Sequence, residues 1–262
     1  MTFLDPWVGG LDAWVLLLLA ATAFATSVLS AIVGMAGGIT LLAVMLLFFD
    51  PLVAGPLHGI VQLVSNSSRT VAQRSHVRWD IVWRYALPLL PLGWLGLLLA
   101  ESISPDVARL IIGVFVLVAT WRPAWILVGT HPENSDPHRR FFGLGAVVGV
   151  VNITVGATGP LIAPFFLNLG WTRFALIGTK AACQTAGHLA KIVVFGIAGF
   201  AFGNWLGLLA ILSLCVIAGT AFGTRLLGGV SERAFIVLYR AVLTLIAVFL
   251  VVRNVSAVWP GG

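Results

Sequence analysis

The chain has 262 residues, of which 60% are hydrophobic and only 9% are charged, and its mean hydropathy is +1.05. A soluble domain of this length carries about a quarter charged residues, so the composition excludes an ordinary soluble domain and indicates a polytopic membrane protein. The net charge of +6 is therefore interpreted by which side of the membrane each loop faces. Nucleic-acid binding is not expected.

The first predicted helix covers residues 13–33, an apolar run long enough to cross about 30 Å of hydrocarbon. Its small residues, in "WVLLLLAATAFA", also suit a secretory signal peptide. A signal peptide begins with a basic segment, whereas Asp5 and Asp12 are the charged residues at this end of the chain. We therefore expect a membrane helix that the protein retains.

A cluster of glycines interrupts this apolar run in the stretch "SAIVGMAGGITL", where Gly34, Gly37 and Gly38 fall within five residues. The same kind of break returns in "NITVGATGPLIA", at Gly156 and Gly159. A long apolar run precedes each break and a short one follows it: 13–33 and 39–49 in the first half, 141–155 and 160–169 in the second. The short runs cannot cross a membrane alone.

The rest of the chain also follows one plan twice. Three longer apolar segments follow each short run, at about 52–73, 82–100 and 107–128 and again at 173–196, 204–224 and 232–252. At an offset of 122 residues, Val33-Gly34 aligns with Val155-Gly156, Gly37 with Gly159, Gln62 with Gln184, and Trp83 with Trp205. Two matched halves with broken helices are typical of secondary transporters.

Each half has an odd number of crossings, whether its broken pair makes two crossings or a re-entrant hairpin, so the second half is inverted. The predicted fold is an all-α polytopic membrane protein with two inverted-topology repeats, and with broken helices after the first helix of each half. The predicted parts are a first membrane repeat at 1–128, a cytoplasmic linker at 129–140 and a second membrane repeat at 141–262. In the polar linker "GTHPENSDPHRRF", His131 and His138 are expected to be solvated loop residues and not metal ligands.

The arginines indicate which side each loop faces. If the loop at 74–84 is cytoplasmic, nine arginines fall on that side: Arg74, Arg78, Arg84, Arg122, Arg139, Arg140, Arg173, Arg225 and Arg233. Only Arg109 and Arg253 fall on the other side, together with an acidic N-terminus. This asymmetry fits the positive-inside rule and predicts that both termini face outward.

The two breaks need a physical reason, because irregular backbone at membrane depth persists only where protein or water satisfies it. A half-helix is predicted to begin after each break, at Ile39 and near Pro160. A helix N-terminus presents free N–H groups and the positive end of a dipole, which attract anions. On this interpretation Gly37, Gly38 and Gly159 bind the substrate. The alternative is that the glycines only allow close helix packing.

Each helix after a break carries one polar stripe. The first stripe is His58, Gln62, Asn66 and Arg69, and the second, at the same four offsets, is Lys180, Gln184, His188 and Lys191. At about 100° per residue these spacings keep each set on one face. Ionisable groups at this depth mark a substrate path, so all eight are predicted substrate-binding residues. Snorkelling to the interface is the alternative, and it suits Arg69 better than Lys180.

The acids lie elsewhere. All nine fall at segment ends or in loops: Asp5, Asp12, Asp50, Asp80, Glu101, Asp106, Glu133, Asp136 and Glu232. A basic interior without carboxylates favours an anionic substrate over a metal cation, and no cofactor is predicted. His58 and His188 can change charge between pH 5 and 8, which suggests proton-linked affinity.

The stretch "VGMAGGITLLAVML", its echo "VGATGPLIAPFFLNLGW" and the two-half plan resemble the sulfite exporter TauE/SafE family of membrane transporters over about 13–252. The family usually shows a richer glycine run and a proline after the first break, and Ala36 and residues 40–43 depart from that pattern. The resemblance implies a multi-pass protein of the bacterial inner membrane. It also implies secondary transport, usually export, of sulfite or of an organosulfonate such as sulfoacetate.

Other functions stay open at this point. An anion channel shares the basic lining, and a structural membrane protein explains the hydrophobicity but not the stripes. An enzyme is not expected, because Cys183 lies five residues before His188 and no intramembrane acid completes a catalytic set. The expected partners are a small anion and the lipid bilayer. Gly219 and Gly223, at a GxxxG-like spacing, leave room for a homodimer.

Overall fold

The structure is a computed structural model of the chain, and it describes residues 10–33, 37–122, 125, 136–156, 158–166, 169–226 and 232–255. These residues form helices and short 3-10 turns, and there is no strand among them. The predicted all-α fold is thus observed throughout the described part of the chain.

The helices follow the predicted order in both halves. The first half contains α1 (Ala13–Val33), α2 (Gly37–Met45), α3 (Pro51–Ala72), α4 (Trp79–Ala86), α5 (Leu89–Glu101) and α6 (Pro105–Trp121). The second half contains α7 (Pro137–Thr154), α8 (Gly159–Ile162), α9 (Arg173–Ile197), α10 (Leu206–Leu226) and α11 (Glu232–Asn254). Short 3-10 turns lie at Arg74–His76, Ala163–Phe166 and Phe202–Trp205.

The start of α7 corrects the predicted linker. Asp136 caps this helix, because its side chain accepts a hydrogen bond from the backbone N of Arg139, and Pro137 occupies the first turn. A capping acid followed by proline favours a helix start, so the helix begins inside the range predicted as linker. His138 therefore lies on α7, and its assignment to a loop is wrong. His131 lies outside the described residues.

The second long segment of the first half is not one continuous helix. It is divided into α4 and α5 at Leu87 and Pro88, because proline has no N–H to continue the helical ladder. The whole stretch Trp79–Glu101 is still long and apolar enough to cross a membrane, as is Phe202–Gly223. By length and composition, these two pass that test among the described residues.

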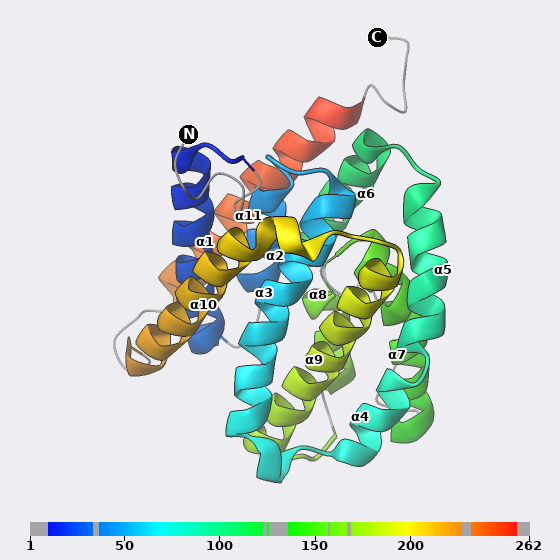
Figure 1. Cartoon of the computed structure of the whole chain (residues 1–262). Helices are drawn as coiled ribbons and strands as arrows, with labels where there is room; N and C mark the ends of the chain where they lie inside the picture. Colours follow the sequence, from blue (N-terminus) through cyan, green and yellow to red (C-terminus); the bar gives the residue numbers. More distant parts are fainter. Residues whose placement is uncertain are drawn as a thin grey trace.

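Two long helices, α3 and α9, lie side by side in the middle of the bundle (Figure 1). On one flank α1 packs against α10, and on the other α7 packs against α4 and α5. A further pair, α6 and α11, also packs together. The start of α1 and the end of α11 lie toward the same end of the bundle, the top of Figure 1, and the turn between α3 and α4 lies at the opposite end.

Glycines let these flanking helices approach closely. A Cβ built on Gly219 of α10 would lie 2.4 Å from the backbone O of Phe24 in α1, and one on Gly223 would lie 2.6 Å from the O of Val28. Only glycine fits at such a backbone contact. These two glycines therefore serve packing within one chain. They do not support a homodimer, which stays a prediction.

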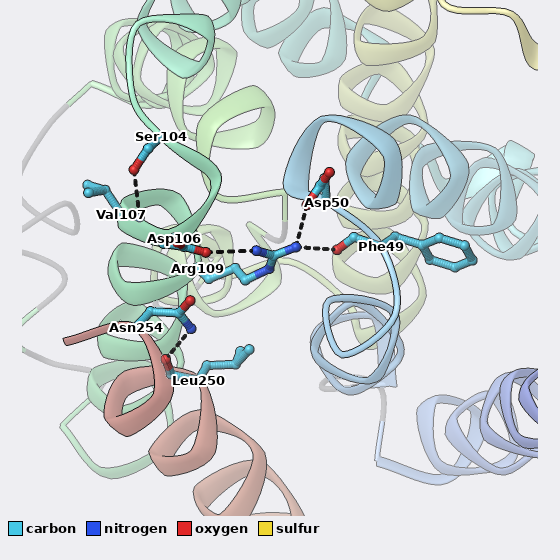
Figure 2. Close-up of polar contacts among 8 residues, drawn as sticks. All are labelled: Phe49, Asp50, Ser104, Asp106, Val107, Arg109, Leu250 and Asn254. Carbon is cyan, nitrogen blue, oxygen red and sulfur yellow. Dashed lines mark hydrogen bonds and ion pairs between the residues drawn. The ribbon is translucent and has the colours of Figure 1, made fainter. Parts of the chain in front are cut away.

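Arg109, near the start of α6, ties that helix to the turn before α3 (Figure 2). Its guanidinium forms ion pairs with Asp50, before α3, and with Asp106 at 3.1 Å, and it donates to the backbone O of Phe49 at 3.4 Å. Ser104 caps α6 by accepting from the N of Val107 at 3.3 Å. The turn between α2 and α3 is thereby tied to the start of α6.

Candidate functional site

The two predicted stripes meet where α3 and α9 pack together. The rings of His58 and His188 are 5.9 Å apart between centroids, at an interplanar angle of 78°. Both histidines are buried, and Lys191, one turn further along α9, is 0% exposed. We call His58, Gln62, His188 and Lys191, with the backbone of Gly38 and Gly156, the central cluster.

The first break contributes a carbonyl group to the central cluster. The backbone O of Gly38 lies 2.8 Å from Nε2 of His58. Because a carbonyl oxygen only accepts, Nε2 carries the proton. The side chain of Gln62 also covers this break, since a Cβ on Gly38 would lie 3.0 Å from its Oε1.

The second break contributes a carbonyl group in the same way. Gly156 has a φ of 85°, which favours glycine, and its backbone O accepts a hydrogen bond from Nζ of Lys191 at 2.8 Å. The aliphatic stem of Lys191 lies against Gly59 of α3, where a Cβ would be 3.0 Å from its Cδ. Leu42 of α2 packs on Gly156, so the two breaks are neighbours in space.

These contacts correct one part of the prediction about the breaks. The N–H of Gly37 does not point freely into the interior, because it donates to Oγ of Ser30 at 3.1 Å. The half-helix predicted at 160–169 is only the single turn α8, followed by the 3-10 turn Ala163–Phe166. The breaks turn carbonyl oxygens toward the basic side chains, and the side chains supply the hydrogen-bond donors.

Close packing is also part of the first break. A Cβ on Gly37 would lie 2.2 Å from both the backbone O of Thr26 and Oγ of Ser30. At the matched position in the second half, a Cβ on Gly159 would meet only Nε2 of Gln184, at 3.8 Å. Gly37 is therefore required for the contact between α1 and α2, whereas Gly159 has room for a side chain.

The remaining stripe residues lie outside the central cluster. Nδ2 of Asn66 donates to the O of Gln62 in its own helix at 2.9 Å, and Arg69 donates to Oγ of Ser65 at 2.9 Å. The ammonium of Lys180 is close enough to the guanidinium of Arg69 for the two like charges to repel each other. Eleven residues separate Lys180 from Lys191, which is about 16 Å along a helix. The stripes thus form two basic groups, one central and one toward the end that carries the α3–α4 turn.

Two side-chain atoms of the central cluster have no hydrogen-bond partner among the described residues. They are Nδ1 of His58 and Nδ1 of His188, and both are buried. Unpaired polar atoms at such depth cost free energy, so they indicate a place for a small polar ligand. With the Nε2 proton of His58 donated to Gly38, its Nδ1 is an acceptor and needs a hydrogen-bond donor. Among the described residues no carboxylate belongs to the central cluster, and Lys191 is its cationic side chain.

Sequence reasoning missed three polar residues around the breaks. Ser30 caps Gly37, Asn152 donates to the backbone O of Gly187 at 2.8 Å, and Tyr85 is buried beside Gly187. Ser30 and Asn152 are themselves separated by 122 residues. A polar residue shortly before each glycine break was therefore a signal in the sequence.

A cavity of about 290 Å³ opens near the top of the bundle. Its lining includes Asp50, Pro51, Glu101 and Pro105, and it reaches Ile153 and Thr154 at the end of α7. Thr154 lies two residues before Gly156, whose carbonyl binds Lys191. The cavity therefore approaches the second break from the end at which Arg109 lies.

Comparison with known proteins adds one finding. A protein-family model described as "Sulfite exporter TauE/SafE" matches residues 19–250. This range includes both breaks, both stripes and all helices from the middle of α1 to most of α11. No curated protein and no solved structure was found to match the chain.

Proposed function

The chain belongs to the sulfite exporter TauE/SafE family of membrane transporters, and we propose that it carries a small sulfur-containing oxyanion out of the cell by alternating access. The proposed substrates are sulfite and organosulfonates such as sulfoacetate. The single observation that carries this proposal is Lys191, which is fully buried, donates to the carbonyl of Gly156 at the second break and lies beside two buried histidines.

The chemistry of Lys191 supports an anion. A buried ammonium is costly unless it is paired, and its bond to the neutral carbonyl of Gly156 leaves its charge without a counter-ion in the central cluster. An oxyanion supplies that counter-ion and accepts several hydrogen bonds. His58 and Lys191 donate to carbonyl oxygens of the breaks in this structure. When an anion binds, these side chains exchange the carbonyl oxygens for oxygens of the anion. A local rearrangement of the breaks then accompanies binding.

We also propose that the two halves are inverted repeats around this site. Three features support the proposal. Matched helices begin at a constant offset, since α2 starts at Gly37 and α8 at Gly159, while α3 starts at Pro51 and α9 at Arg173, 122 residues apart in each case. Gln62 covers the first break and Gln184 the second. The packing of α1 on α10 corresponds to that of α7 on α5.

The orientation in the membrane gives a separate prediction. Ser75, in the α3–α4 turn, and Ser102, between α5 and α6, are exposed serines at opposite ends of the bundle. In a background with Cys183→Ala and Cys215→Ala, we expect Ser102→Cys to react with a membrane-impermeant maleimide in intact cells. Ser75→Cys should react only after permeabilisation, because the positive-inside rule places its arginine-rich loop in the cytoplasm. The reverse pattern would refute the proposed orientation.

The transport proposal is tested with purified protein in proteoliposomes. We expect saturable uptake of labelled sulfite, and accelerated exchange when unlabelled sulfite or sulfoacetate is loaded inside. Sustained single-channel currents carried by sulfite would instead identify an anion channel. Absence of any flux from correctly folded protein would favour a structural role.

A further inference from the structure

Two arginines near the end of α6 each lie over a tryptophan ring. Cζ of Arg240, on α11, is 5.6 Å from the ring centroid of Trp121, the last residue of α6. Cζ of the next residue, Arg122, is 5.8 Å from the ring centroid of Trp125. All four side chains are exposed. An arginine stacked on an aromatic face keeps the N–H groups at the edge of its guanidinium available to a ligand.

Hydrogen bonds hold Trp121 and Arg240 next to each other. Nε1 of Trp121 donates to Oγ1 of Thr244 at 2.9 Å, and the same hydroxyl group donates to the backbone O of Arg240 at 2.6 Å. The indole ring is thereby joined to the turn of α11 that carries the arginine. The ring is a fixed surface for the guanidinium, which therefore loses less conformational entropy when it binds a ligand.

These two arginines have no carboxylate partner in the part of the chain that the structure describes. The ion pairs found there involve Arg78 and Arg109. Arg122 directly follows α6, where the negative end of the helix dipole favours a cation. Arg240 lies eight residues after the start of α11, so no helix end accounts for its charge. A partner from outside these residues is needed to balance it.

An apolar surface adjoins the arginines on α6 and α11, which pack together. Val114, seven residues before Trp121, and Val248, eight residues after Arg240, are both exposed. These spacings place each valine on the same side of its helix as the aromatic or basic residue. In a membrane protein, such an exposed apolar face contacts acyl chains, and a charged group at its end lies at the level of the head groups.

We propose that Arg240 and Arg122 bind the phosphate of an anionic phospholipid such as phosphatidylglycerol, whose acyl chains lie against α6 and α11. The guanidinium of Arg240 donates to two phosphate oxygens, in the bidentate geometry that arginine favours. Arg122 adds a second positive charge. Basic groups at the ends of membrane helices recognise anionic head groups in this way. The site is separate from the central cluster and does not depend on which anion is transported.

The test is a titration of the purified full-length protein in detergent with dioleoyl phosphatidylglycerol, followed by native mass spectrometry. We expect Arg240→Gln to weaken binding of the most tightly held lipid at least about 10-fold, as for the loss of a hydrogen bond to a charged group. Arg253→Gln is the matched control. Arg253 is also an exposed arginine of α11 that lies over an aromatic ring, with Cζ 5.8 Å from the ring centroid of Phe249. The control should bind the lipid as the wild type does.

Trp121→Leu keeps every charge and removes the ring beneath Arg240, so we expect it to weaken the binding as well. Gel filtration and the melting temperature establish that each variant is folded. Unchanged binding in both Arg240→Gln and Trp121→Leu would overturn the site. Equal weakening in Arg253→Gln would also overturn it, because the lipid would then respond to net charge alone. Equal affinity of the wild type for phosphatidylcholine would contradict the preference for an anionic lipid.

Discussion

Lys191→Gln is expected to lower kcat/KM for sulfite uptake by at least about 100-fold. Removing one partner of a buried charge pair typically costs about 2–5 kcal/mol or more, and Lys191 is the fully buried ammonium of the central cluster. The measurement is the initial rate of sulfite uptake in proteoliposomes across a range of concentrations. Gel-filtration behaviour and thermal stability in detergent establish that the variant is folded.

Lys180→Gln is the matched control, because Lys180 and Lys191 are the two lysines of the chain. Lys180 lies beside Arg69 at the other basic group, so Arg69 keeps a positive charge there. We expect about a 10-fold decrease or less, equivalent to about 1.4 kcal/mol, because the guanidinium of Arg69 remains as a cation at this end. A larger loss in Lys180→Gln than in Lys191→Gln would place the substrate site at the Arg69 end.

Gly37→Ala is expected to prevent normal folding or to destabilise the protein by about 3 kcal/mol or more. Its methyl group would stand 2.2 Å from the backbone O of Thr26. A backbone group cannot rotate aside as a flexible side chain does, so α1 and α2 must separate, and forcing extra volume into a packed interior is costly. The measurement is the yield of monodisperse protein and its melting temperature in detergent.

Gly159→Ala is the control at the matched position of the second half. Its methyl group meets only Nε2 of Gln184, at 3.8 Å, so we expect a melting temperature close to that of the wild type. Equal damage from both substitutions would mean that the second break is as tightly packed as the first. Equal tolerance of both would contradict the close contact between α1 and α2.

The polar stripes could be predicted from the sequence because helical spacing determines which residues share a face. His58 and His188 also meet, with ring centroids 5.9 Å apart, but helical spacing does not determine which faces of two helices pack together. Spacing does not determine which part of a stripe meets the breaks. Arg69 lies about three turns from His58, and Lys180 about three turns from Lys191, although each pair shares a face of its helix.

The direction of the backbone groups at the breaks could not be predicted. Whether a glycine turns its N–H or its carbonyl toward the interior depends on its dihedral angles, and glycine accepts almost all of them. The N–H of Gly37 donates to Oγ of Ser30 only because α2 packs back against α1. In contrast, the start of α7 was predictable, since the Asp136–Pro137 pair is a local helix-start signal.

The most direct test is a cryo-electron microscopy map of the protein with saturating sulfite. Binding at the central cluster predicts density for a compact anion between α3 and α9, within hydrogen-bond distance of Nζ of Lys191 and of a ring nitrogen of His58 or His188. Lys191→Gln should lack this density under the same conditions. Density only beside Arg69 and Lys180, or none between the breaks in protein that shows saturable uptake, would contradict the central site.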